Sequence, residues 1–370
     1  MDASDLQYSR GLLIGLLTTP ASLPGESDSW DAGRLVNVAR HEGVVGLLHA
    51  RLAEPAMVDL VPAAVREAVA RAAQPEVARS LYLESHGRRL LARLAAAQLP
   101  VLLLKGSALA YWAYGDPWQR NCGDIDLLLR SRAEVDRAAV ILADMGYRPS
   151  TGALPGDLVS FELTLEYAAE GASRLEVDLH WRLSSTPMFA FRFDWDELEA
   201  GAIALPTLAD GARGLMPVHA WLHACMHRLQ NRANGVPDTL KWIYDLDLLG
   251  RLFASDDWDV LAGMACERGL AGASLDGAAA AAARFGAVMP DATRVRLMRA
   301  AASEPMDIDR LDQWWYVQRM SLAAYPTLGL KLDWLRQRLM PDRAHLRARY
   351  GADTGLFCAL LRRLRSALRR

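Results

Sequence analysis

The sequence has few of the features that mark secreted, zinc-stapled or membrane proteins. Its 370 residues include only four cysteines, which are widely spaced and form no Cys-x-x-Cys pair. We therefore expect neither a disulfide framework nor a structural zinc site. No apolar run approaches the roughly 20 residues of a membrane span, and no signal-peptide pattern opens the chain. These absences predict a cytoplasmic protein with no membrane span.

The chain also lacks an excess of charge of one sign. Its formal net charge is −2 and its pI is about 6.5, so no global basic surface points to long nucleic acid. Hydrophobic residues make up 52% of the chain and charged residues 23%, which is typical of a globular protein with a substantial core. At about 100–200 residues per domain, this length predicts two or three domains.

Three regions follow from changes in composition along the chain. Residues 1–98 show apolar positions at helical spacing, with expected breaks that include Pro75 and one long helix over 81–97. Residues 99–215 contain short apolar runs, and residues 216–370 return to helical spacing. We predict an N-terminal helical region, a small core and a C-terminal helical domain, divided at these boundaries.

The core reads as an α+β unit with a mixed sheet. Val101–Leu104 and Ile125–Leu129 are short apolar runs typical of buried strands. Phe161–Tyr167 and Leu175–Trp181 alternate in polarity, which predicts an antiparallel hairpin. Further helices are expected over 132–145, 219–231, 238–249 (with Asp238 as N-cap) and 356–370, the last one basic and amphipathic.

Two acids at the start of the second strand are the strongest local signal. Asp124 and Asp126 stand two residues apart, so they share one face of the strand. Adjacent carboxylates repel each other unless a cation lies between them, and Mg²⁺ is often held by carboxylates plus substrate phosphates. The alternative interpretation is a solvated strand end with two surface acids.

A later strand supplies a third acid. Glu176, Asp178 and His180 share one face of it, and acids near a core are costly unless they are paired or bound to metal. If Asp178 meets Asp124 and Asp126, three carboxylates can hold two Mg²⁺ ions, with Mn²⁺ as a substitute, which suits displacement at phosphorus. His180 then supports a carboxylate or the acceptor. The alternative is an edge strand with a wet face.

Residues around the first strand end are candidates to bind phosphate. Gly106-Ser107 lies between a predicted strand and a predicted helix, where backbone N–H groups favour an anion. The alternative interpretation is an ordinary strand-to-helix turn. Lys105 is beside this turn. Arg120 can clamp a phosphate or lie at the surface.

Two helices further along the chain add weaker candidates. His223 and His227 share a helical face and are expected to line the cleft or pack beside it, although their spacing also occurs in zinc sites. Lys241 can reach a triphosphate or the acceptor, but Lys241 and Asp245 also form a plausible intrahelical salt bridge.

The order of these motifs resembles the DNA-polymerase-beta-like nucleotidyltransferase superfamily, and more narrowly an uncharacterised bacterial nucleotidyltransferase family. The segments that carry the resemblance are Leu104-Lys105-Gly106-Ser107-Ala108-Leu109, Gly123-Asp124-Ile125-Asp126-Leu127-Leu128, Val177-Asp178-Leu179-His180-Trp181, Trp221–His227 and Leu240–Asp245. The resemblance implies that Gly106 and Ser107 grip the triphosphate of an NTP. It also implies that Asp124, Asp126 and Asp178 bind the metals. One departure is the gap of sixteen residues between Ser107 and Asp124, longer than the commonest superfamily spacing.

The resemblance predicts Mg²⁺-dependent transfer of a nucleotidyl group from an NTP to an acceptor hydroxyl or phosphate. Some members of the family are found with genes that tailor peptides, including lasso peptides, so the acceptor can be a peptide, a sugar or a small molecule. One alternative is transfer of a sugar or other phosphorylated group from a nucleotide donor to a phosphopeptide. Others are a regulatory module that binds nucleotide without turnover, and the modifying half of a toxin–antitoxin pair.

Overall fold

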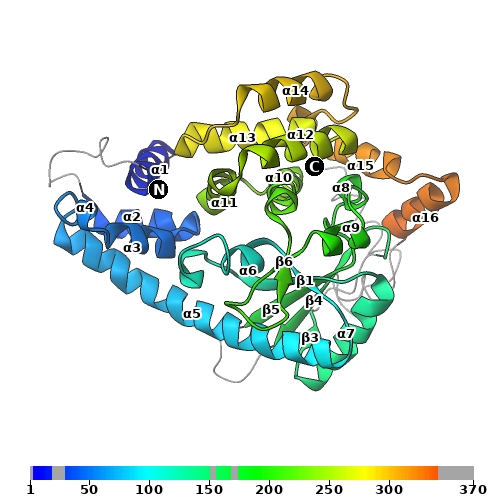
Figure 1. The fold of residues 1–370 in the computed structure, drawn as a ribbon, viewed down its shortest axis with the longest axis horizontal. Helices are drawn as coiled ribbons and strands as arrows, with labels where there is room; N and C mark the ends of the chain where they lie inside the picture. Colours follow the sequence, from blue (N-terminus) through cyan, green and yellow to red (C-terminus); the bar gives the residue numbers. More distant parts are fainter. Residues whose placement is uncertain (1–2, 19–29, 151–155, 168–173, 341–370) are drawn as a thin grey trace.

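A mixed β-sheet lies at the centre of the computed structural model, which describes residues 3–18, 30–150, 156–167 and 174–340 (Figure 1). The strands are β1 (Leu102–Leu103), β2 (Asp124–Leu128), β3 (Arg148–Pro149), β4 (Glu162–Tyr167), β5 (Leu175–His180), β6 (Ile203–Ala204) and β7 (Arg213–Gly214). The helices that precede the sheet are α1 (Ala3–Leu17), α2 (Ala32–His41), α3 (Val45–Leu52), α4 (Pro55–Val58) and α5 (Ala63–Ala96).

Further helices lie within the sheet region and after it. Those within it are α6 (Lys105–Leu109), η3 (Pro117–Gln119), α7 (Arg132–Asp144), α8 (Pro187–Ala190) and α9 (Trp195–Ala200). Those that follow are α10 (Pro217–Ala233), α11 (Leu240–Leu252), α12 (Ser255–Arg268), α13 (Ala271–Phe285), α14 (Asp291–Ala301), η4 (Ile308–Arg310), α15 (Trp314–Ala323) and α16 (Leu328–Leu339). The basic helix predicted over 356–370 lies outside the described residues.

The sheet confirms the predicted mixed α+β core. Its strand order is β3-β4-β5-β2-β1-β7-β6. The hairpin β4–β5 is antiparallel as predicted, whereas β2 and β5 run parallel to each other. The register of β2 and β5 places Asp126 opposite Asp178, and Leu128 opposite His180.

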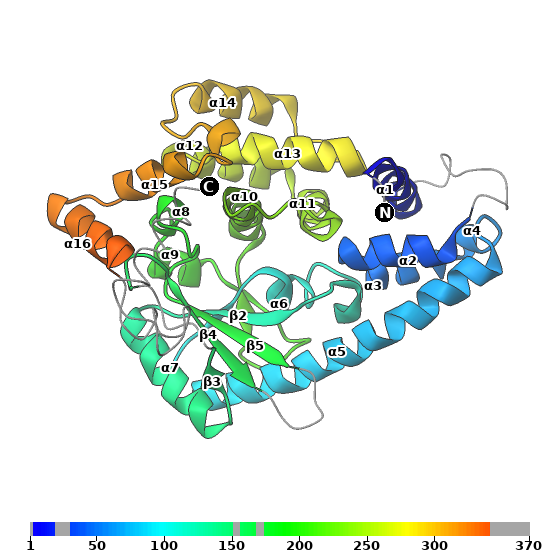
Figure 2. The ribbon, with the colours of Figure 1, turned by 180° about the vertical axis from the view of Figure 1, so that it is seen from behind.

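The two faces of the sheet differ in chemistry because side chains alternate along each strand. Ile125, Leu127, Val177 and Leu179 point to one face and pack in a core with residues of α5 and α7. The opposite face carries the acids of β2 and β5, together with His180. Helices α10 and α11 lie across this second side in both views (Figures 1 and 2).

Helix α5 corrects one expectation from the sequence. The break expected at Pro75 does not occur, and the helix predicted over 81–97 is the second half of a continuous helix of 34 residues. A proline inside a helix removes one hydrogen bond and crowds the preceding turn. Contacts of α5 with α2, α3, α7 and β2 hold the helix on both sides of this position, so tertiary packing outweighs the local cost.

The N-terminal and C-terminal helices share one hydrophobic core. Buried side chains of α1, α2, α3 and α5 belong to the same cluster as those of α10, α11, α13 and α15. The helices predicted over 219–231 and 238–249 correspond to α10 and α11. The helices on either side of the sheet region thus pack together. The domain boundaries at residues 98 and 215 stay a prediction.

Asp238 does not cap α11, contrary to the expectation. The N-cap position is Thr239, and its side chain makes no capping hydrogen bond. The carboxylate of Asp238 instead accepts hydrogen bonds from Arg228 Nε and Nη2. An ionised guanidinium is a stronger donor than a backbone N–H, so this pairing displaces the local cap.

Close packing of α3 on η3 gives the first testable prediction. A Cβ at Gly46 would collide with the carbonyl oxygen of Trp118, which is backbone and cannot rotate away. We expect Gly46→Ala to lower the free energy of unfolding by about 1–3 kcal/mol, as overpacking generally does. Urea denaturation curves measure this loss.

Gly11→Ala is the matched control, because Gly11 lies in α1 and a Cβ there meets nothing within 4 Å. Alanine replaces glycine favourably in a helix, so this variant should gain about 0.5–1 kcal/mol. Equal stability of Gly46→Ala and wild type would contradict the close approach of α3 to η3.

Candidate active site

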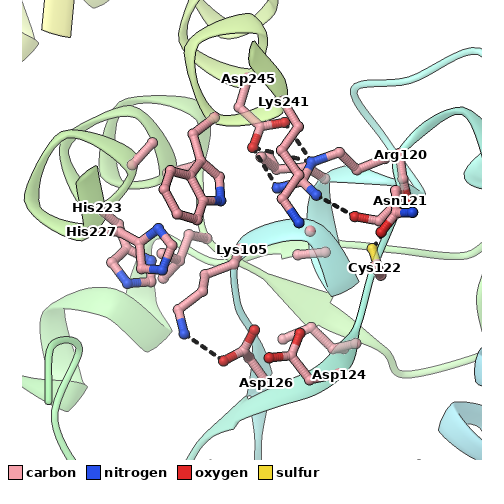
Figure 3. Close-up of a pocket in the computed structure, with 18 of the residues that line it drawn as sticks. Lys105, Arg120, Asn121, Cys122, Asp124, Asp126, His223, His227, Lys241 and Asp245 are labelled. Carbon is pink, nitrogen blue, oxygen red and sulfur yellow. Dashed lines mark hydrogen bonds and ion pairs between the residues drawn. The ribbon is translucent and has the colours of Figure 1, made fainter. Parts of the chain in front are cut away.

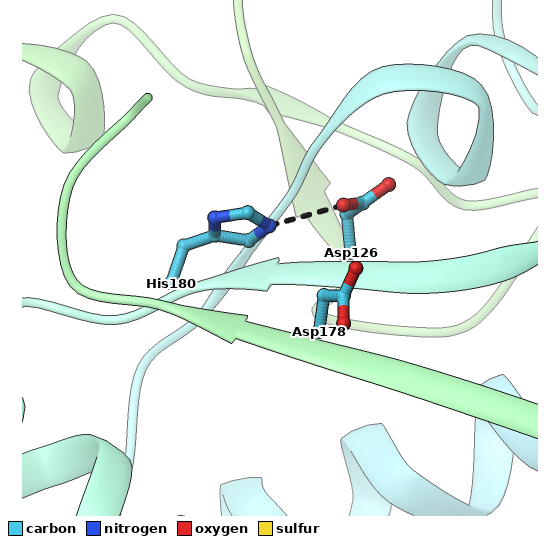
Figure 4. Close-up of side chains that lie close together, drawn as sticks. All are labelled: Asp126, Asp178 and His180. Carbon is cyan, nitrogen blue, oxygen red and sulfur yellow. Dashed lines mark hydrogen bonds and ion pairs between the residues drawn. The ribbon is translucent and has the colours of Figure 1, made fainter. Parts of the chain in front are cut away.

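Parallel pairing of β2 with β5 brings two acids and a histidine together. Asp126 and Asp178 stand opposite each other on one face of the sheet, and His180 is two residues further along β5. One ligand atom from each of the three side chains lies within 4.8 Å of the others (Figure 4). Asp178 therefore meets Asp126 across neighbouring strands as predicted, whereas Asp124 stands opposite Glu176 and is not part of this group.

Asp126 is the more enclosed acid of the group, with only 2% of its surface exposed. Its Oδ1 accepts a hydrogen bond from Lys105 Nζ at 2.6 Å, and His180 Nε2 lies 3.0 Å from the same oxygen. Burial alone would raise the pKa of Asp126, but Lys105 and His180 together hold that pKa well below its usual range. Asp126 is therefore ionised at neutral pH.

The negative charge of Asp126 acts on two neighbouring acids, Asp124 and Asp178. The charge of Asp126, followed by burial, raises the pKa of Asp124 to about 7, although Lys105 opposes the shift. Burial and then Asp126 raise the pKa of Asp178, whose Oδ1 accepts a hydrogen bond from Thr164 Oγ1 at 2.6 Å. A further cation beside these acids would relieve their repulsion.

The donor set fits a hard divalent cation. Carboxylate oxygens are the ligands that Mg²⁺ and Mn²⁺ prefer, and a buried, ionised carboxylate such as Asp126 is unfavourable without a positive partner. Lys105 supplies that partner here, because its ammonium lies against Asp126 as a bound cation would. Asp126, Asp178 and His180 are the residues that could hold a metal together, and the role of Asp124 as a further ligand stays a prediction.

Lys105 has a backbone conformation that is uncommon for a residue with a side chain. Its φ is +48°, in the left-handed region, at the point where β1 ends and α6 begins. Such a conformation costs of order 1 kcal/mol or more, and it persists only where the surroundings fix it. The ion pair with Asp126 is one contact that holds Lys105 in this position.

Gly106 and Ser107 serve the local structure of the site. A Cβ at Gly106 would lie 2.8 Å from Cys122 Sγ and 3.1 Å from Arg120 Nη1, so only glycine fits there without movement. Ser107 Oγ donates to the carbonyl oxygen of Leu104 at 2.7 Å and accepts from the N–H of Asp126 at 3.1 Å. Ser107 thus fastens β2 to the end of β1, and its contact with phosphate stays a prediction.

Arg120 is buried and fully engaged, so its interpretation as a surface residue is wrong. Arg120 Nε donates to Asp245 Oδ1 at 2.8 Å, and Nη2 donates to Asp245 Oδ2 at 2.7 Å. Its Nη1 donates to the carbonyl oxygen of Asn121, and Tyr114 Oη donates to Asp245 Oδ1. Asp245 therefore pairs with Arg120. Among the described residues, Asp245 makes no salt bridge with Lys241, which was the alternative interpretation. The contact of Arg120 with phosphate stays a prediction.

A pocket opens between the sheet region and helices α10 and α11, where the cleft was expected (Figure 3). Residues on the sheet side include Lys105, Asp124 and Asp126, whereas α11 contributes Lys241. In the described residues, the Lys241 ammonium makes no hydrogen bond or ion pair, and it lies 6.0 Å from the centroid of the Trp242 ring. Burial, and then Arg120, lowers the pKa of Lys241. The pocket thus contains a cation that is available to an anion.

His223 and His227 line the same pocket from α10. Burial, and then the charge of Lys105, lowers the pKa of His223 to about 3, and burial also lowers the pKa of His227 strongly. Both rings are therefore neutral at pH 7. They can donate or accept a hydrogen bond, but they do not add charge against a phosphate.

Several residues in or near the site were not predicted from the sequence. Among them, Trp112, Asn121 and Cys122 line the pocket. The position of Thr164 beside Asp178 could have been predicted, because the two residues are paired in the predicted hairpin. Tyr114 gives no such signal, since its partner Asp245 is 131 residues away.

A mixed sheet that carries these acids beside a Gly-Ser turn, with helices on both sides, defines a nucleotidyltransferase core. The chain belongs to the uncharacterised nucleotidyltransferase family, whose model matches residues 28–286. No curated protein matches the chain. None of the helices in the described ranges is long and apolar enough to cross a membrane.

The ion pair of Lys105 with Asp126 leads to a prediction about divalent cations. Replacing Lys105 by methionine removes the ammonium and leaves the carboxylates more negative. We expect Lys105→Met to bind Mn²⁺ about tenfold more tightly than wild type, which corresponds to about 1.4 kcal/mol. Calorimetric titration with Mn²⁺ measures the change.

Lys241→Met is the matched control, since it removes a pocket ammonium that does not touch Asp126. Its affinity for Mn²⁺ should change much less. Weaker Mn²⁺ binding by Lys105→Met than by wild type would show that Lys105 does not occupy the place of a cation.

Proposed function

We propose that the protein transfers a nucleotidyl group from a Mg²⁺-bound NTP to an acceptor hydroxyl or phosphate. The observation that carries the proposal is the cluster of Asp126, Asp178 and His180 beside a pocket that contains Lys241. Membership of the nucleotidyltransferase family supports the same reaction. The acceptor we propose is a peptide, a sugar or a small molecule, in agreement with a net charge of only −2.

The proposed step forms a bond between the acceptor oxygen and the α-phosphorus, and breaks the bond from that phosphorus to the β-phosphate. Pyrophosphate leaves, and the acceptor loses a proton. Mg²⁺, when bound, would neutralise charge on the phosphoryl oxygens and lower the pKa of the attacking hydroxyl. Such a reaction depends mainly on positioning and on charge neutralisation.

The chain's own residues would divide these tasks. Asp124, Asp126 and Asp178 would hold the metal, and Asp178 would help to activate the acceptor oxygen, through the metal or as a general base. Lys241 would hold the phosphates of the donor. With a metal held at Asp126, the Lys105 ammonium would be available as a second cation for the same phosphates. The neutral rings of His223 and His227 would help to orient the bound molecule.

Nucleotide binding tests the proposal directly. Calorimetric titrations with ATP, CTP, GTP and UTP, with and without Mg²⁺, should identify an NTP that binds only with Mg²⁺. We expect Asp126→Asn to weaken this binding about 100-fold or more, because the variant loses the charge at the centre of the metal site.

Glu166→Gln is the matched control, since Glu166 is an acid on the same sheet that pairs with Arg174. It should bind the NTP as wild type does. Binding that is independent of Mg²⁺, or that survives Asp126→Asn, would contradict the proposal. Binding of sugar nucleotides in place of every NTP would favour transfer of a sugar group.

A further inference from the structure

The start of α11 is capped by a turn from the N-terminal region of the chain. The N–H of Leu240 donates to Glu42 Oε2 at 2.7 Å, across 198 residues of sequence. The N–H of Lys241 donates to the carbonyl oxygen of Glu42 at 3.2 Å. The first N–H groups of a helix have no partner within the helix, so Glu42 satisfies two donors that Asp238 and Thr239 leave open.

Glu42 is itself held firmly between α2 and α3. Only 3% of its surface is exposed, and Arg10 Nε of α1 lies 3.1 Å from its Oε1. Arg10 Nη2 also donates to the carbonyl oxygen of Asp238 at 3.0 Å, just before α11 begins. Three N-terminal helices are therefore joined to the first turn of α11 through one carboxylate.

The next residue, Gly43, is in direct contact with the side chain of Lys241. Its φ is +69°, a conformation that favours glycine. A Cβ at Gly43 would lie 2.6 Å from Lys241 Cδ and 3.3 Å from both Cγ and Cε. The aliphatic part of Lys241 thus runs over the bare backbone of Gly43, which fixes the direction of the side chain.

The other end of that side chain lies in the pocket. Figure 3 shows the Lys241 amino group directed into the space above Asp124 and Asp126. Because the stem packs on Gly43, its direction depends on the turn between α2 and α3. An ammonium that is already oriented loses less entropy when it binds an anion.

We propose that Glu42 and Gly43 position Lys241, so that the N-terminal helical region sets the affinity of the pocket for the polyphosphate of its ligand. This inference rests on the proposed function, because that function supplies the polyphosphate. Glu42 and Gly43 are positioning residues, and Lys241 is the residue that contacts the anion.

A double-mutant cycle tests the inference with inorganic tripolyphosphate and Mg²⁺ as the probe. Calorimetry compares wild type, Gly43→Ala, Lys241→Ala and the double variant. We expect each single variant to bind the probe about tenfold more weakly than wild type. If Gly43 acts through Lys241, Gly43→Ala should have no further effect once Lys241 is alanine.

Two further readouts separate positioning from general damage to the fold. Affinity for Mn²⁺ alone should be the same in Gly43→Ala and wild type, since Gly43 does not contact the carboxylates. Gly43→Ala should also lower stability less in the Lys241→Ala background, where the crowded stem is gone. Gly11→Ala, with open space around its Cβ, should leave probe binding unchanged.

Additive losses of probe affinity in the double variant would overturn the inference, because Gly43 would then act independently of Lys241. The inference would also be overturned if wild type and Lys241→Ala bound a Mg²⁺-bound NTP with the same affinity. The proposed function would stand in that case. If wild type bound neither tripolyphosphate nor any NTP, both would fail.

Discussion

Repulsion between carboxylates on one buried face of the sheet is the constraint on which the site depends. Two unit charges 4 Å apart interact by about 4 kcal/mol at the effective dielectric of a protein surface. That energy is comparable with the whole stability of a typical domain, about 5–15 kcal/mol, so the repulsion must be compensated. Lys105 and His180 compensate at Asp126, whereas the raised pKa of Asp124 shows that compensation there is incomplete. A divalent cation would complete it.

Other features of the site follow from this constraint. Lys105 pairs with Asp126 from a left-handed backbone position between β1 and α6, which this ion pair helps to hold. Ser107 then ties Asp126 to the end of β1, so the carboxylate and its counter-charge belong to one connected unit. The gap of sixteen residues between Ser107 and Asp124 has a structural use as well. It contains Tyr114 and Arg120, which bind Asp245 and thereby join the sheet region to α11.

The sequence allowed prediction of what depends on local pattern. Alternation of polar and apolar residues is a property of single strands, so the hairpin, the two buried strands and the shared face of Asp178 and His180 could be foreseen. The positions of Asp124 and Asp126 on β2 followed from the same rule. The family resemblance supplied the connection among these elements.

What escaped prediction depends on residues far apart in the chain. The pairing of Arg120 with Asp245 spans 125 residues, and the cap of α11 by Glu42 spans 198. Pro75 signals a break by its own chemistry, but packing of α5 on neighbouring elements keeps the helix intact. Such contacts are set by tertiary structure, which single-sequence patterns do not encode.

Crystallography with Mn²⁺ and the NTP that binds best tests the central claim most directly. The account predicts an anomalous manganese signal beside Asp126 and Asp178, with the Lys105 ammonium moved away from Asp126. A structure with nucleotide bound, no manganese at these carboxylates and the pair of Lys105 with Asp126 intact would contradict it.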